Sequence, residues 1–127
     1  MENQIKTFED ACKALNLNPE ESLPEVSKVS EKHRKAIIAH CKLVIIAEAL
    51  NEGWKPDWSD NERKYYPWFD MEESVKQSTG SGLSYYVYAD DCSGSTVGSR
   101  LCFKTWELAK YAGTQFKVEY ADYFLID

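Results

Sequence analysis

The sequence predicts an α+β fold in which about three helices pack on a small antiparallel sheet of about three strands. Residues 36–50 are almost entirely aliphatic, with twelve apolar residues of fifteen, as expected of a helix in the middle of a domain. Among the aromatic residues only Phe8 precedes Trp54, so the second half of the chain is rich in rings. Residues 83–88 combine leucine, tyrosine and valine, and the last two favour strands. The first half therefore predicts helix and the second half predicts sheet.

The size and composition predict one folded domain, 1–127, because 43% of the residues are hydrophobic and 28% are charged. We expect a helical N-terminal half, 7–53, followed by an aromatic-rich sheet and a C-terminal helix over 63–125. The net charge of −6 disfavours nucleic acid as a partner, since Lys and Arg supply most of that affinity. The first residues contain no apolar run, and the aliphatic segment is short for a membrane span. A cytoplasmic protein with no membrane association is therefore expected.

Capping residues mark the expected helices. Thr7 is followed three residues later by Asp10, a shortened capping box that predicts the start of the first helix. Ser30 is the expected N-cap of the aliphatic helix, and Gly53 follows where a left-handed residue can end a helix. Thr105 is the expected N-cap of the last helix.

The last helix is expected to run from Thr105 to about Phe124. Its apolar residues recur at intervals of three and four, which predicts an amphipathic helix with one buried stripe. The stripe consists of Trp106, Ala109, Ala112, Gly113, Phe116, Tyr120 and Phe124.

Three segments predict the strands of the sheet. Residues 63–69 predict a strand at an edge or at a bulge, because Pro67 has no backbone N–H to donate. Residues 83–88 are expected to pair with 97–103 as a hairpin with a long, turn-rich loop.

Four segments of the chain resemble small uncharacterised proteins encoded by phages, prophages and mobile elements of gut Bacteroidetes. The segments are Thr7–Leu15, Ala36–Trp54, Tyr65–Phe69 and Val97–Lys104. The resemblance implies a bacterial host cytoplasm, or a virion, as the place where the protein acts. It implies no catalytic residue.

Patterns for catalysis and metal binding are weak. The four cysteines have no zinc-site spacing and are expected to remain thiols: Cys12, Cys41, Cys92 and Cys102. The histidines are His33 and His40, and His40 adjoins Cys41, but neighbouring helical side chains point about 100° apart. Two alternatives stay open. In one, His33 pairs with Cys92 or Cys102 as the catalytic residues of a hydrolase. In the other, Asp90, Asp91 and Ser93 bind a divalent ion weakly. The expected protein is not an enzyme and has no catalytic residue, cofactor or metal.

The predicted site is an aromatic outer face of the sheet. Alternation along 83–88 places Val87 toward the core and Tyr86 and Tyr88 outward. The candidate partner-binding residues are Tyr86, Tyr88, Arg100, Tyr66, Trp68 and Trp58, with Trp54 at the border.

Tyrosine, tryptophan and arginine are enriched at the energetic centres of protein interfaces. The leading hypothesis is therefore a small accessory protein that contacts a protein partner of unknown identity. The alternative is a binder of single-stranded nucleic acid, in which the same rings stack on unpaired bases. A third interpretation has this face covered by other parts of the chain as additional core. The oligomeric state is left open.

Overall fold

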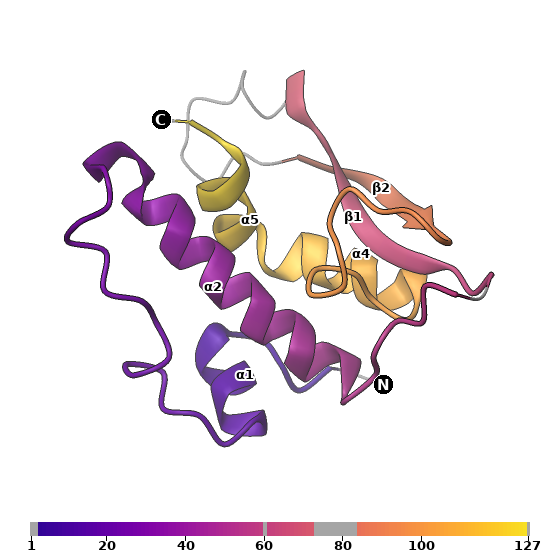
Figure 1. Cartoon of the computed structure of the whole chain (residues 1–127), viewed down its shortest axis with the longest axis horizontal. Helices are drawn as coiled ribbons and strands as arrows, with labels where there is room; N and C mark the ends of the chain where they lie inside the picture. The colour runs from indigo at the N-terminus through magenta and orange to yellow at the C-terminus, as the bar shows by residue number, and fades with distance from the viewer. Residues whose placement is uncertain (1–2, 60, 73–83, 127) are drawn as a thin grey trace.

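The computed structural model describes residues 3–59, 61–72 and 84–126. The elements are α1 (Phe8–Ala14), α2 (Glu31–Asn51), β1 (Lys64–Asp70), β2 (Ser84–Asp91), α4 (Trp106–Gln115) and α5 (Lys117–Phe124) (Figure 1). The described residues thus contain four named helices and a two-stranded antiparallel sheet, which confirms the predicted α+β class.

Helix α2 crosses the middle of the molecule and packs against α1 and α5 (Figure 1). Its aliphatic composition explains this position, because both neighbours cover apolar residues that would otherwise face water. The buried apolar residues of α2 are Ala39, Leu43, Ile46, Ala47, Ala49 and Leu50. Nearer its N-terminus the cover is incomplete, and Ile37 is 44% exposed.

The ends of α1 and α2 only partly follow the predictions. The Thr7 hydroxyl accepts a hydrogen bond from the Asp10 backbone N–H at 3.0 Å, and the Asp10 carboxylate accepts one from the Thr7 N–H at 3.1 Å. This confirms the capping box of α1. Ser30 is the N-cap residue of α2, as predicted, but its hydroxyl does not make the expected capping hydrogen bond. Helix α2 ends before two residues in the left-handed conformation, Glu52 (φ 49°) and Gly53 (φ 85°). The predicted helix end at Gly53 is therefore confirmed.

The predicted C-terminal helix is two helices, α4 and α5, joined at Phe116. The Thr105 hydroxyl caps α4 by accepting from the Leu108 N–H at 3.1 Å, as predicted. The Thr114 hydroxyl donates to the backbone carbonyls of Lys110 (2.9 Å) and Tyr111 (3.2 Å). Such bonds compete with the helical ladder and bend helices, which accounts for the break.

Strand β1 pairs with β2, and the predicted hairpin between 83–88 and 97–103 is wrong. Only one bridge remains of the expected third strand, between Tyr65 and Phe103. The Ser95 hydroxyl accepts hydrogen bonds from the backbone N–H groups of Val97 (3.1 Å) and Gly98 (2.9 Å) and folds this segment into a turn. These local bonds occupy the groups that a strand would use.

The register between the strands shifts between Trp68 and Phe69, one residue beyond Pro67. The prediction of an edge strand or bulge at this proline is therefore confirmed. Helix α4 packs against both strands. The hydrophobic core joins residues of α1, α2, β1, α4 and α5 with Leu101 and Phe103.

Candidate functional site

The two faces of the sheet have opposite surroundings. Residues that oppose each other in the register share a face, so Tyr88 lies on the side of Pro67, and Val87 on the side of Trp68. The Tyr88 ring lies 5.9 Å from Trp106 of α4 in a stacked arrangement and 5.4 Å from Tyr65 edge-on. The prediction of Tyr88 on the outer face is wrong, because this side of β2 is the one that α4 covers.

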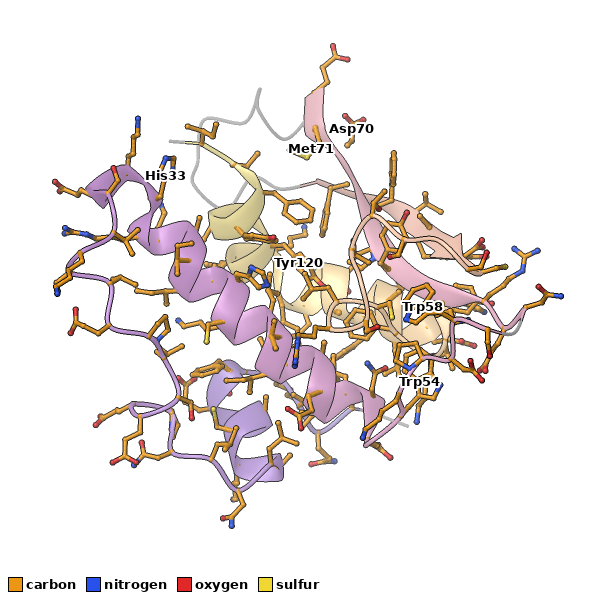
Figure 2. The ribbon with its side chains drawn as sticks, in the orientation of Figure 1. His33, Trp54, Trp58, Asp70, Met71 and Tyr120 are labelled. Carbon is orange, nitrogen blue, oxygen red and sulfur yellow. The ribbon has the colours of Figure 1, made fainter. Side chains whose placement is uncertain are left out.

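The opposite face carries Trp68 and Val87 as a cross-strand pair. Trp68 is 51% exposed and Val87 is 40% exposed, so the prediction of Val87 in the core is wrong. Met71 is 42% exposed and follows β1 at this end of the sheet (Figure 2). We call the pair of Trp68 and Val87 the Trp68 surface. Tyr86, a predicted partner of these residues, has its side chain outside the described residues.

The other end of this face is covered by the chain itself. Lys64 is fully buried, and its ammonium group donates to the Cys92 carbonyl at 2.9 Å and lies 5.1 Å from the centre of the Trp58 ring. The Trp58 indole N–H donates to the Ser99 hydroxyl at 2.7 Å. Trp58 therefore joins the segment after α2 to the loop after β2, and Figure 2 shows it with Trp54 near the end of α2.

Hydrogen bonds accepted by the Asp57 carboxylate stabilise the turn that carries Trp58. The carboxylate accepts from the Ser59 hydroxyl at 2.6 Å and from the Ser59 backbone N–H at 2.9 Å. These two bonds, with a contribution from the charge of Lys64, lower the pKa of the Asp57 carboxyl. The Asp57 carboxylate therefore stays charged across the neutral pH range.

Asn51 holds the far end of the same loop. Its side-chain amide is buried at the end of α2, donates to the Cys102 carbonyl at 2.9 Å and accepts from the Lys104 N–H at 3.2 Å. At the near end, the Thr96 hydroxyl donates to the Tyr66 hydroxyl at 3.4 Å. Loop 96–104 is thus anchored to α2, to β1 and to Trp58.

A cavity of about 470 Å³ lies between this loop, α2, β1 and α5, and we call it the aromatic cavity. Its walls are rich in rings and include one histidine and one arginine. The lining residues are His40, Tyr66, Pro67, Thr96, Val97, Gly98, Ser99, Arg100, Leu101, Tyr120, Tyr123 and Phe124. Among the described residues that line it there is no aspartate or glutamate.

Three polar side chains of this lining determine what it can bind. Tyr120 is 4% exposed, burial raises the pKa of its phenol, and its hydroxyl makes no hydrogen bond within the described residues. Arg100 is exposed, and its guanidinium makes no hydrogen bond or ion pair in the described part of the chain. The His40 ring is half-buried and lies 4.8 Å from the Tyr123 ring. Figure 2 shows Tyr120 in the interior, where α2, α5 and the sheet meet.

A second cavity of about 470 Å³ lies on the other side of Arg100. It is lined by Val44, Glu48, Asn51, Gly53, Trp54, Lys55, Pro56, Ser99 and Arg100. Ser99 and Arg100 line both cavities, so the loop forms a wall between them.

The structure brings only some of the predicted residues together. Tyr66 and Arg100 line the aromatic cavity, and Trp58 is linked to it through Ser99. Trp68 lies on the same sheet face but belongs to the exposed surface, and Tyr88 lies on the opposite face.

Sequence reasoning missed Tyr120 and Tyr123 as cavity residues and assigned Tyr120 to the buried stripe of the last helix. A signal was present, since a tyrosine in an otherwise apolar stripe introduces a hydroxyl that needs a partner.

In the described ranges 3–59, 61–72 and 84–126, no three His, Cys, Asp or Glu side chains gather as metal ligands. Burial raises the pKa of the Cys12 thiol, with a smaller contribution from the charge of Glu9.

Comparison of the chain with protein-family models, curated proteins and solved structures found no match. None of the helices in the described residues has the length and apolar character needed to cross a membrane.

Proposed function

We propose that the protein is a non-enzymatic binding protein of a phage or mobile element, and that it contacts a protein partner through the Trp68 surface. The observation that supports the proposal is the exposure of Trp68, 51%, on the sheet face that α4 leaves free. A tryptophan held on a strand offers a large apolar area at a low cost in conformational entropy. Val87, the cross-strand neighbour of Trp68, is 40% exposed and extends the apolar area.

The expected partner presents an apolar pocket with a basic rim. An indole ring gains most when it enters a dry pocket, and the net charge of −6 favours a partner of opposite charge. The sequence resemblance supports a bacterial cytoplasm or a phage particle as the setting.

The test is affinity capture from infected bacterial cells, followed by binding measurements with the purified candidate partner. Trp68→Ala is expected to weaken binding at least tenfold, while unfolding free energy changes by less than about 1 kcal/mol. Trp106→Ala is the matched control, because Trp106 is also exposed (43%) but stacks on Tyr88 on the helix side. It is expected to keep the affinity and lose stability.

Equal affinity of the wild type and Trp68→Ala for every purified candidate partner contradicts the proposal. So does tight binding of single-stranded oligonucleotides that weakens steeply with salt, because that result assigns the rings to base stacking.

A further inference from the structure

The aromatic cavity has the size and the walls of a site for a small organic molecule. Its volume of about 470 Å³ falls within the range of roughly 300–1,000 Å³ that is usual for ligand pockets. Four rings from β1 and α5 line it: Tyr66, Tyr120, Tyr123 and Phe124. A planar molecule can stack on such rings, whose faces and edges favour flat aromatic partners.

A buried hydroxyl without a partner lies in this wall. Tyr120 is 4% exposed, and nothing in the described residues accepts a hydrogen bond from its phenol. Buried polar groups in folded proteins are nearly always hydrogen-bonded. Because burial also keeps the phenol protonated, the group that completes this site is a hydrogen-bond acceptor.

The charge of the lining favours an anion. Arg100 places an unpaired guanidinium at the cavity, and no carboxylate of the described residues lines it. The Arg100 side chain offers five N–H donors in a planar fork, which matches a carboxylate or a phosphate. Aromatic pockets also bind quaternary ammonium ions, but the Arg100 guanidinium opposes a cation here, because no carboxylate among the described residues lines this cavity.

We propose that the aromatic cavity binds a small planar molecule that carries one anionic group, with its ring between the tyrosines and its anion on Arg100. An acceptor atom of the ligand receives the hydrogen bond from Tyr120. The anionic group is a carboxylate or a phosphate, since both fit the guanidinium. This site is separate from the Trp68 surface and does not depend on a protein partner.

The test compares charged probes with their neutral counterparts by ligand-observed NMR and calorimetry, up to about 1 mM. Indole-3-acetate is paired with indole-3-acetamide, and adenosine 5′-monophosphate with adenosine. At least one anion is expected to bind at least tenfold more tightly than its neutral partner. The tighter of the two anions identifies carboxylate or phosphate as the preferred group.

Variants then assign the binding to the cavity. Arg100→Gln is expected to abolish the preference for the anion, whereas Arg63→Gln, which removes the same charge from an ion pair with Asp90, keeps it. Tyr120→Phe is expected to weaken the charged and the neutral probe alike, by at least threefold. Trp68→Ala is expected to bind every probe as the wild type does.

Three results overturn the proposal: no saturable binding of either anion, equal binding of each anion and its neutral counterpart, or equal effects of Arg100→Gln and Arg63→Gln. Tighter binding of choline than of both anions overturns it as well. None of these results bears on the Trp68 surface, so failure here is distinguishable from failure of the proposed function.

Discussion

Replacement of Tyr120 by phenylalanine is predicted to stabilise the protein, although most substitutions in a core destabilise. Tyr120 packs tightly, with its ring 5.1 Å from Phe69 and 5.7 Å from Phe124. These contacts belong to the ring, which phenylalanine keeps. The substitution removes only the hydroxyl, which is buried without a partner in the described residues.

The expected gain follows from the desolvation of that hydroxyl. An unsatisfied buried polar group costs about 1–3 kcal/mol, and the small void left by the oxygen offsets part of this. We expect a gain of about 1 kcal/mol in unfolding free energy at pH 7, measured by urea denaturation. Thermal unfolding should shift upward by roughly 4 °C for a domain of this size.

The gain should widen at alkaline pH. Burial raises the pKa of Tyr120 in the folded protein, while in the unfolded chain the phenol titrates near its ordinary value of about 10. Above that pH the unfolded state binds fewer protons than the folded state, so this group makes wild-type stability fall as pH rises. The difference between Tyr120→Phe and the wild type should grow by about 1.4 kcal/mol between pH 9 and pH 11.

Tyr111→Phe is the matched control, because the Tyr111 hydroxyl donates to the Ile5 carbonyl at 2.6 Å. Loss of this hydrogen bond should destabilise Tyr111→Phe by about 1 kcal/mol, whereas Tyr120→Phe should gain about 1 kcal/mol. The unfolding free energies of the two variants should therefore differ by about 2 kcal/mol. A loss of stability in Tyr120→Phe equal to that of Tyr111→Phe would refute the reasoning, since it would mean that the hydroxyl has a partner.

Two further predictions concern the loop anchor and the thiols. Asn51→Ala should destabilise by about 2–4 kcal/mol in urea denaturation, because it removes the hydrogen-bond partner of the buried Cys102 carbonyl and of the part-buried Lys104 N–H. A loss below about 1 kcal/mol contradicts the anchor. With a thiol reagent under native conditions, the half-buried Cys41 and Cys92 should react well before the buried Cys12 and Cys102. Labelling of all four thiols at the same rate contradicts this burial pattern.

Local features of the fold were predictable from the sequence. Each helix cap joins residues only three positions apart, so both partners lie within one short segment of the sequence. This holds for the capping box of Thr7 and Asp10 and for the cap at Thr105. The α+β class followed from an aliphatic segment and a separate ring-rich half, which bury their apolar surfaces in different ways.

Features that depend on long-range pairing were not predictable. Residues 97–103 have strand-like composition, but Ser95 binds their backbone locally and β1 takes their place beside β2. Alternation along β2 separates two faces but does not determine which of them α4 covers. The predicted inner and outer faces are therefore reversed, and Tyr88 packs on α4 while Val87 is exposed.

In the candidate site, too, residue types were predictable from the sequence but long-range contacts were not. Aromatic and arginine content drew attention to Tyr66 and Arg100 as partner-binding residues, which stays a prediction. Their position with Tyr120 in one cavity depends on a loop that Asn51 anchors. That anchor joins residues about fifty positions apart and follows no short-range pattern. The cavity therefore became visible only with the fold.

The most direct test of the proposed ligand site is a backbone amide NMR titration with indole-3-acetate. Saturable shifts are expected at Gly98–Leu101 of the loop and at Tyr120–Phe124 of α5, with none at Trp68 or Val87. Shifts confined to Trp68 and Val87, or no shifts at all, would contradict a binding site in the aromatic cavity.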